Sequence, residues 1–183
     1  MTVQPLAIPD VKLITPKKFG DNRGFFAETY SFKTLQDAGI DCTFVQDNHS
    51  LSATPGTVRG LHYQVAPHAQ CKLIRVLKGS ILDVAVDIRR GSPTFGKFVT
   101  AVLSSENFQM MYVPTGFAHG FATLEPNTEV AYKVSTYYAP AAERGIRWND
   151  PAIGVPWNIA ESEATLSGKD KIAPMLKDTA ELF

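Results

Sequence analysis

The chain has 183 residues, the length of one domain, and is long enough to bury a single hydrophobic core without disulfides or metals. Lysine plus arginine and aspartate plus glutamate each number 18, so the formal net charge is zero. No overall field therefore attracts nucleic acid or an anionic membrane, and any anion site must be a local cluster of charges.

The N-terminal segment and the cysteines both indicate a cytoplasmic protein. The stretch MTVQPLAIPDVKL has no basic region and no apolar run long enough for a signal peptide or a membrane span. Cys42 and Cys71 are the only cysteines and lack the spacing of a metal motif, so we expect free thiols and no disulfide. Because no repeat or linker interrupts the chain, we expect a single domain over residues 1–183.

The first predicted element is a short helix in the stretch SFKTLQDAGI. Ser31 is the expected N-cap, Phe32 and Leu35 share a face, and Gly39 lies where a C-terminal cap falls. From Cys42 to Tyr138 the pattern is typical of strands at regular spacing, broken by turn signals at residues 54–56, 78–80, 89–93, 114–116 and 125–127. This rhythm predicts an all-β sandwich or barrel.

The stretch ILDVAVDIR shows the strand pattern most plainly. Leu82, Val84, Val86 and Ile88 alternate with Asp83, Ala85, Asp87 and Arg89. One face is therefore core, and the other is either solvent-exposed or the polar lumen of a barrel. After Tyr138 the chain becomes rich in aromatic residues and proline, and we expect a wrap-around tail with one or two helical turns.

A candidate metal motif lies in VPTGFAHGF, where Pro114, Gly116 and His119 have a P-x-G-x-x-H spacing that resembles the second motif of cupin barrels. Metal-binding cupins also carry a first motif with the pattern H-x-H. In this sequence that place resembles the motif only in part, because it holds His62, Tyr63 and Gln64 and so lacks the second histidine. Two histidines alone leave a transition metal without its third and fourth protein ligands. The sequence therefore predicts no metal.

His62 lies in the middle of a predicted strand, between the apolar Leu61 and Tyr63, and a hydrogen-bonded core histidine is the simplest interpretation. Polar residues are dense around it, however, and they indicate the wall of a polar, cationic pocket. Tyr132 shares a face with the apolar Val130 and is expected inside the barrel. Its hydroxyl either bonds the backbone or faces a ligand and donates a proton, and the residues alone permit both.

Five stretches taken together closely resemble the dTDP-4-dehydrorhamnose 3,5-epimerase family. They are DNRGFFAE, FVQDNHSLSATPGTVRGLHYQ, QCKLIRVLKGSILDVAVDIRRGSPTFG, YVPTGFAHGF and GIRWNDPAIGVPW, in order over residues 10–175. The resemblance implies a cupin-like double-stranded β-helix, or jelly-roll barrel, with a few short helices. It also implies a homodimer without metal or other cofactor, which epimerises a nucleotide-linked 4-keto-6-deoxysugar in L-rhamnose synthesis.

The resemblance implies a role for each matching residue. The histidine of RGLHYQ, the family's general base, falls on His62, and the aspartate that pairs with it falls on Asp170, although Asp83 is a second carboxylate that could reach the ring. The lysine near the ketone falls on Lys72, and the proton donor on the opposite face falls on Tyr132.

The resemblance also implies the residues that hold the nucleotide. Tyr138 matches the aromatic residue that stacks on thymine. The matches for diphosphate and nucleotide contacts are Gln46, Asn48, Arg59, His119, Glu143 and Lys169, with Arg23 and Glu28 reaching across from the partner subunit.

These residue types suit the reaction on chemical grounds. Hydrogens on carbons 3 and 5 of a 4-ketosugar lie α to a carbonyl, so removing one makes an enolate. A histidine next to a carboxylate can take such a proton near neutral pH, a lysine can stabilise the enolate oxygen, and a tyrosine can return a proton from the other face. Three alternatives remain: an enzyme that inverts carbon 3 only or isomerises a related ketosugar, a non-catalytic sugar-binding cupin, and a metal-dependent cupin oxygenase.

Overall fold

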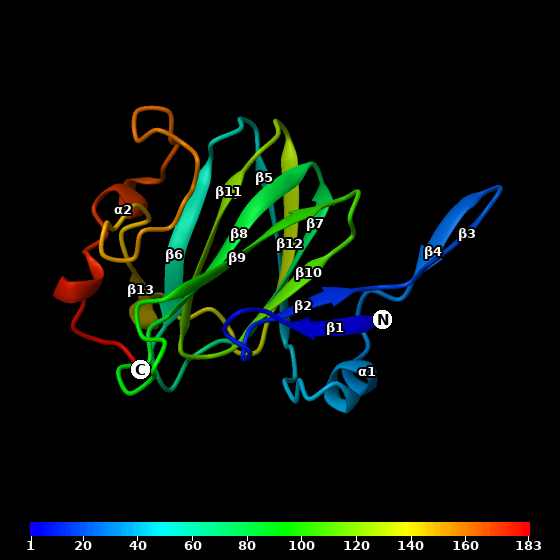
Figure 1. Ribbon diagram of the computed structural model, residues 1–183, viewed down its shortest axis with the longest axis horizontal. Helices are drawn as coiled ribbons and strands as arrows, with labels where there is room; N and C mark the ends of the chain where they lie inside the picture. Colours follow the sequence, from blue (N-terminus) through cyan, green and yellow to red (C-terminus); the bar gives the residue numbers. More distant parts are fainter.

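The computed structural model describes residues 1–183, in which two β-sheets face each other and a separate hairpin projects from the body (Figure 1). The strands of the first sheet, in spatial order, are β1 (Thr2–Pro5), β2 (Lys12–Thr15), β10 (Met110–Val113), β7 (Lys72–Lys78), β12 (Thr128–Val134) and β5 (Gln46–Ser52). Those of the second are β13 (Glu143–Gly145), β6 (Val58–Gln64), β11 (Phe117–Thr123), β8 (Ser80–Asp87) and β9 (Phe98–Ser104).

The helices are short and lie outside the sheets. They are α1 (Phe32–Asp37), α2 (Gly168–Lys171) and the 3-10 turns η1 (Pro140–Ala142) and η2 (Leu176–Asp178). The Ser31 side chain accepts a hydrogen bond from the Thr34 N–H, which confirms the predicted N-cap of α1. Leu35 is buried on the inner face of α1, but Phe32 stays 38% exposed. No helix is both long enough and apolar enough to cross a lipid bilayer.

The main core lies between the two sheets, where apolar side chains of both inner faces interlock. Its members include Ile74 of β7, Ala85 of β8, Phe121 of β11 and Val130 of β12. All neighbouring strands within each sheet are antiparallel, as expected for a sandwich or barrel made of hairpins and crossovers. The all-β fold predicted from the turn spacing is therefore confirmed.

The outer faces of both sheets are also covered. The C-terminal tail packs Trp148, Trp157 and Leu176 over the five-stranded sheet, while the segment around α1 packs Leu35 and Ile40 against the six-stranded sheet. Neither face of strand β8 is therefore open to solvent, because Val84 and Val86 pack under the tail while Ala85 on the opposite face lies in the interior between the sheets. The predicted wrap-around tail with short helical turns, α2 and η2, is confirmed (Figure 1).

The N-terminal 27 residues form four strands that the alternation pattern did not predict. Two of them, β3 (Lys18–Asp21) and β4 (Gly24–Ala27), make the hairpin that extends away from the body (Figure 1). Its phenylalanines Phe19, Phe25 and Phe26 are 54 to 70% exposed. Only Phe25 has an aromatic partner in its own chain, the ring of Phe108 with 5.4 Å between the two centroids, so the hairpin is an arm whose apolar side chains remain largely exposed.

Candidate active site

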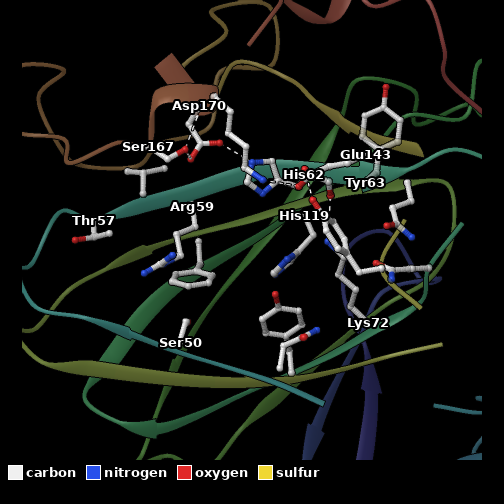
Figure 2. A pocket seen from close by; sticks show the side chains of 18 of the residues that line it. Ser50, Thr57, Arg59, His62, Tyr63, Lys72, His119, Glu143, Ser167 and Asp170 are labelled. Carbon is white, nitrogen blue, oxygen red and sulfur yellow. Dashed lines mark hydrogen bonds and ion pairs between the residues drawn. The ribbon is translucent and has the colours of Figure 1, made fainter. Parts of the chain in front are cut away.

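A cavity of about 640 Å³ opens between the sheets and gathers most of the predicted site residues. Its walls come from β5, β6, β7, β11 and β12, and the α2 segment closes one side. The predicted residues that line it are Gln46, Asn48, Arg59, His62, Lys72, His119, Tyr132, Tyr138, Glu143, Lys169 and Asp170. Figure 2 shows the side chains of His62, His119 and Lys72 extending into one shared space.

His62 and Asp170 form a hydrogen-bonded pair, with 2.5 Å between the ring Nε2 and the carboxylate Oδ1. His62 lies on β6, and Asp170 is brought to it by α2, which packs beside that strand. Burial opposes ionisation of Asp170, but hydrogen bonds from His62 and Ser167 outweigh burial and hold the pKa of this carboxyl below its ordinary value. An ionised Asp170 can orient the His62 ring and stabilise the positive charge that this ring gains when it accepts a proton.

Ser167 supports this pair and was not among the predicted residues. The Ser167 hydroxyl donates to Asp170 Oδ2 at 2.7 Å. The hydroxyl oxygen of Ser167 also accepts a hydrogen bond from the Asp170 N–H at 3.2 Å, so Ser167 is the N-cap of α2. The sequence signal was present, since SGKD has the spacing of a capping box, in which a serine precedes an acidic residue by three positions.

Close packing of β6 against β11 fixes the position of His62. Gly60 has φ +124°, and a Cβ on it would lie 2.5 Å from the Cα of Gly120 on the neighbouring strand. The two glycines therefore allow a backbone approach that no larger residue permits. Two residues beyond Gly60, His62 pairs in register with His119.

Lys72 is a buried cation at the start of β7. Its residue is 9% exposed, and its ammonium donates to the backbone oxygen of His62 at 3.2 Å. Burial lowers the pKa of Lys72 from 10.5 to about 8, even though the carboxylates of Asp83 and Glu143 favour the charged form. The Lys72 side chain is therefore still charged at neutral pH, but neutral pH lies only about one unit below this pKa.

Asp83 pairs with His119 instead of His62. The distance from His119 Nε2 to Asp83 Oδ1 is 2.8 Å, and both side chains are buried. Of the two carboxylates that the sequence offered to His62, Asp170 is therefore the one that contacts its ring, whereas Asp83 contacts the ring of His119. Burial lowers the pKa of His119, and the adjacent Asp83 offsets part of that effect. Asp83 Oδ2 is buried without a hydrogen-bond partner.

Tyr132 faces His62 from the other sheet. It lies on β12 opposite Asn48 of β5 and lines the cavity, so its phenol and the His62 ring belong to opposite walls. Burial raises the pKa of Tyr132, partly countered by the positive charge of Arg59. At neutral pH the phenol therefore keeps its proton and is available as a donor.

Polar contacts centre on Glu143 at one end of the cavity. It accepts from Lys169 at 2.5 Å and from the Tyr138 hydroxyl at 2.9 Å. Burial opposes its ionisation, but these two bonds outweigh burial and keep the pKa of Glu143 below its ordinary value. Tyr138 is 53% exposed, and its backbone N–H donates to the side-chain oxygen of Gln46. An exposed aromatic ring fixed in this way offers a stacking surface for a base.

Of the predicted charged residues, Arg59 lies in the cavity, whereas Arg23 and Glu28 lie on or next to the projecting β3–β4 hairpin. Arg59 lines the cavity and donates to Ser52 Oγ at 3.3 Å and to the Leu51 carbonyl at 3.1 Å. Arg23 lies on the projecting hairpin and pairs with Asp21. Glu28 borders a separate depression with Arg75. Within one chain, Arg23 and Glu28 are thus outside the cavity.

The histidines of the cavity are arranged for acid–base work. His62 and His119 each contact a carboxylate of their own, and the chain contains no group of three or more His, Cys, Asp or Glu side chains placed to hold a metal ion. A carboxylate-bound histidine and a phenol on facing walls can remove a proton from one side of a carbon and return it to the other. Fold and site together define a β-barrel isomerase of the acid–base type.

Comparison with known proteins specifies the family. The family model of dTDP-4-dehydrorhamnose 3,5-epimerase matches residues 5–178. The chain is 51% identical to the dTDP-4-dehydrorhamnose 3,5-epimerase of Sinorhizobium fredii over 96% of this chain and 90% of that protein. The chain belongs to the dTDP-4-dehydrorhamnose 3,5-epimerase family.

Solved structures agree with this assignment. The dTDP-6-deoxy-D-glucose-3,5-epimerase of Legionella pneumophila, in complex with dTDP-4-keto-L-rhamnose, superposes with a TM-score of 0.93 at 44% identity, covering 98% of this chain and 94% of that one. The Bacillus anthracis dTDP-4-dehydrorhamnose 3,5-epimerase, with TDP and PPi bound, gives 0.92 at 48% identity, covering 95% and 98%. The predicted cupin-like jelly-roll fold is confirmed.

Proposed function

We infer that this protein is a dTDP-4-dehydrorhamnose 3,5-epimerase, an isomerase of L-rhamnose biosynthesis. It inverts carbons 3 and 5 of dTDP-4-dehydro-6-deoxy-D-glucose and yields dTDP-4-dehydro-L-rhamnose. The observation that carries this function is the His62–Asp170 pair, which faces Tyr132 across a cavity that also holds the buried Lys72. Relatives that bear this name match over nearly the whole chain.

In the reaction that we propose, His62 takes the proton from a carbon next to the ketone. Asp170 holds the ring in place and stabilises the resulting imidazolium, while the Lys72 ammonium stabilises the enolate oxygen. A donor of this kind in a dry pocket contributes on the order of 3 kcal/mol. Tyr132 then returns a proton from the opposite wall, which inverts the carbon. The substrate and product have the same oxidation level, so the step as written consumes no cofactor.

The nucleotide end of the substrate is assigned to the polar end of the cavity. Tyr138 offers its exposed ring to the thymine, and Arg59 offers a planar guanidinium to the diphosphate. The remaining proposed contacts come from Gln46, Asn48, His119, Glu143 and Lys169. The local cluster of Arg59, Lys72 and Lys169 explains how a chain of zero net charge can bind a dianionic ligand.

The function is tested by turnover of dTDP-4-keto-6-deoxyglucose coupled to a reductase and NADPH, with heavy water as solvent. We expect product formation and deuterium wash-in at both carbon 3 and carbon 5. Exchange at carbon 3 alone would assign a 3-epimerase instead. The control is His62→Asn, which keeps the side-chain size but removes the base, and we expect its turnover to fall about 10²–10⁴-fold. Wild-type turnover in this variant would refute the mechanism.

We further propose that the protein is a homodimer with shared sites, in which Arg23 and Glu28 on or next to the projecting hairpin complete the cavity of the partner. The largely exposed phenylalanines of this arm, Phe19, Phe25 and Phe26, support the proposal. Mixing Arg23→Ala and His62→Ala proteins should restore activity, because one site of each heterodimer then carries both changes and the other carries none. Random exchange gives about a quarter of full activity. Exchange without any recovery would place Arg23 in the site of its own chain.

We also propose that residues 1–183 form one domain that works in the cytoplasm. The cavity that holds the proposed site residues uses both sheets and the C-terminal tail, so no part of the chain forms the site alone. Cys42 and Cys71, both free thiols, suit a reducing compartment.

A further inference from the structure

The segment that carries Tyr138 has no strand partner of its own. It runs from Thr136 to Ala139, between the end of β12 and the turn η1. No backbone–backbone hydrogen bond involves residues 136–138. Tyr137 and Tyr138 are 68% and 53% exposed, so side-chain packing does little to hold them. The position of the Tyr138 ring therefore depends on hydrogen bonds that other side chains make to this segment.

Gln64 holds the backbone on both sides of Tyr138. Its amide Nε2 donates to the Tyr137 carbonyl at 3.4 Å, and its Oε1 accepts from the Ala139 N–H at 2.8 Å. Nε2 also donates to the His68 carbonyl at 2.7 Å, so the nitrogen and the oxygen of this buried amide both have partners. Because a carbonyl can only accept and an N–H can only donate, neither a carboxylate nor an apolar side chain of the same size makes all three bonds.

A second glutamine holds the start of the segment. The Gln70 amide donates to the Thr136 carbonyl at 2.5 Å, and the Thr136 hydroxyl donates to the Ala69 carbonyl at 3.0 Å. The loop between β6 and β7 is thus the frame to which the Tyr138 segment is attached. Gln64 anchors this loop as well, through its bond to a loop carbonyl.

Gln64 lies on the same strand as the proposed proton acceptor. His62 and Gln64 are two positions apart on β6, so their side chains leave the same face, roughly 6–7 Å apart along the strand. A dTDP-sugar has to place its thymine at Tyr138 while its reacting carbon lies at His62. Through Gln64, both ends of this span are referred to one strand.

We propose that Gln64 is a positioning residue, which fixes the Tyr138 ring for stacking on thymine and thereby sets the affinity for the nucleotide. The proposal rests on the proposed function, because it takes Tyr138 as the surface that receives the thymine.

The first test measures the binding of dTDP to the wild-type chain and its variants by isothermal titration calorimetry. Tyr138→Ala removes the ring and should weaken binding about 5–150-fold, the range for stacking of a base on an aromatic side chain. Gln64→Met keeps the side-chain length but removes three hydrogen bonds, and binding should weaken about fivefold or more, though by no more than in Tyr138→Ala. Gln36→Met, at an exposed position of α1, is the control and should leave the Kd unchanged. Wild-type affinity in Gln64→Met would overturn the proposal.

A double-mutant cycle separates positioning from direct contact with the ligand, because Gln64 also lines the cavity. If Gln64 acts through the Tyr138 ring, adding Gln64→Met to Tyr138→Ala should weaken dTDP binding by less than about twofold more. An equal loss in both backgrounds would make Gln64 a direct ligand contact and would overturn the positioning role.

Gln70→Met provides a second cycle that remains decisive if Gln64→Met does not fold, since Gln70 is less buried. It removes one bond to the same segment, so dTDP binding should weaken about two- to fivefold, and this loss should disappear in the Tyr138→Ala background. Unchanged binding in Gln70→Met, or the same loss without the ring, would overturn the view that these amides hold Tyr138.

Steady-state kinetics give a readout that a general structural role would not produce. In Gln64→Met the KM for the dTDP-sugar should rise with the Kd for dTDP, while kcat should fall by less than about threefold, because His62, Lys72 and Tyr132 keep their places. A lower kcat at unchanged KM would overturn the proposal. A wild-type chain that binds dTDP without epimerising the sugar would refute the proposed function and leave the binding cycle valid, whereas an additive cycle in an active enzyme would refute the role of Gln64 alone.

Discussion

Replacing Lys72 by methionine should raise the stability of the folded protein and at the same time remove most of its activity. The ammonium is buried, and its pKa falls from 10.5 to about 8 on folding. A decrease of 10.5 − 8 = 2.5 units, at 1.36 kcal/mol per unit, means that the charged form costs about 3 kcal/mol in the folded state. Methionine has nearly the same shape and carries no charge.

Loss of the hydrogen bond to the His62 carbonyl offsets about 1 kcal/mol of this gain. The net stabilisation of Lys72→Met at pH 7 is then about 2 kcal/mol, or a rise in Tm of about 4–8 °C for a chain of this length. In the same variant, kcat should fall about 10²–10³-fold, because the enolate oxygen loses its donor.

The pH dependence has a definite sign. A lysine whose pKa is lowered in the folded state binds more protons when unfolded, so wild-type stability rises with pH between about 8 and 10.5. The advantage of Lys72→Met is therefore complete below pH 8 and disappears as pH approaches 10.5. Thermal unfolding across this range measures it, with Lys78→Met, an exposed lysine of the same strand, as the control. Equal destabilisation of Lys72→Met at every pH would refute the reasoning.

Three further predictions concern the proposed mechanism. Tyr132→Phe should lose product formation about 10²–10⁴-fold yet retain deuterium exchange at the substrate carbon, since His62 can take and return a proton on one face; loss of both by isotope-resolved mass spectrometry would place Tyr132 in the abstraction step. Ser167→Ala should cost about 1 kcal/mol of stability and reduce kcat, whereas exposed Ser162→Ala should change neither. The wild-type kcat should decline as pH rises through about 8, where Lys72 loses its proton, and a flat profile up to pH 10 would contradict the oxyanion role.

Local patterns determined much of the fold. Strict alternation along β8, turn residues between the strands and the N-cap at Ser31 depend on neighbouring residues only, so the sequence alone was enough to predict them. The N-terminal strands could not be predicted in this way, because Thr2–Pro5 and Lys12–Thr15 are four-residue segments that pair with each other, and only the second also pairs with β10. Strands this short carry too little pattern to be distinguished from loop.

The site shows the same division. Family motifs identified His62, Lys72 and Tyr132 as the proposed catalytic residues, and the sequence alone placed each on a strand. Which carboxylate holds His62 was a tertiary question, since Asp170 is 108 positions away and reaches the ring only because the tail packs beside β6. The burial that lowers the pKa of Lys72 is likewise a property of two facing sheets. Residue types are written in the sequence, but their distances and their access to water arise only when the chain folds.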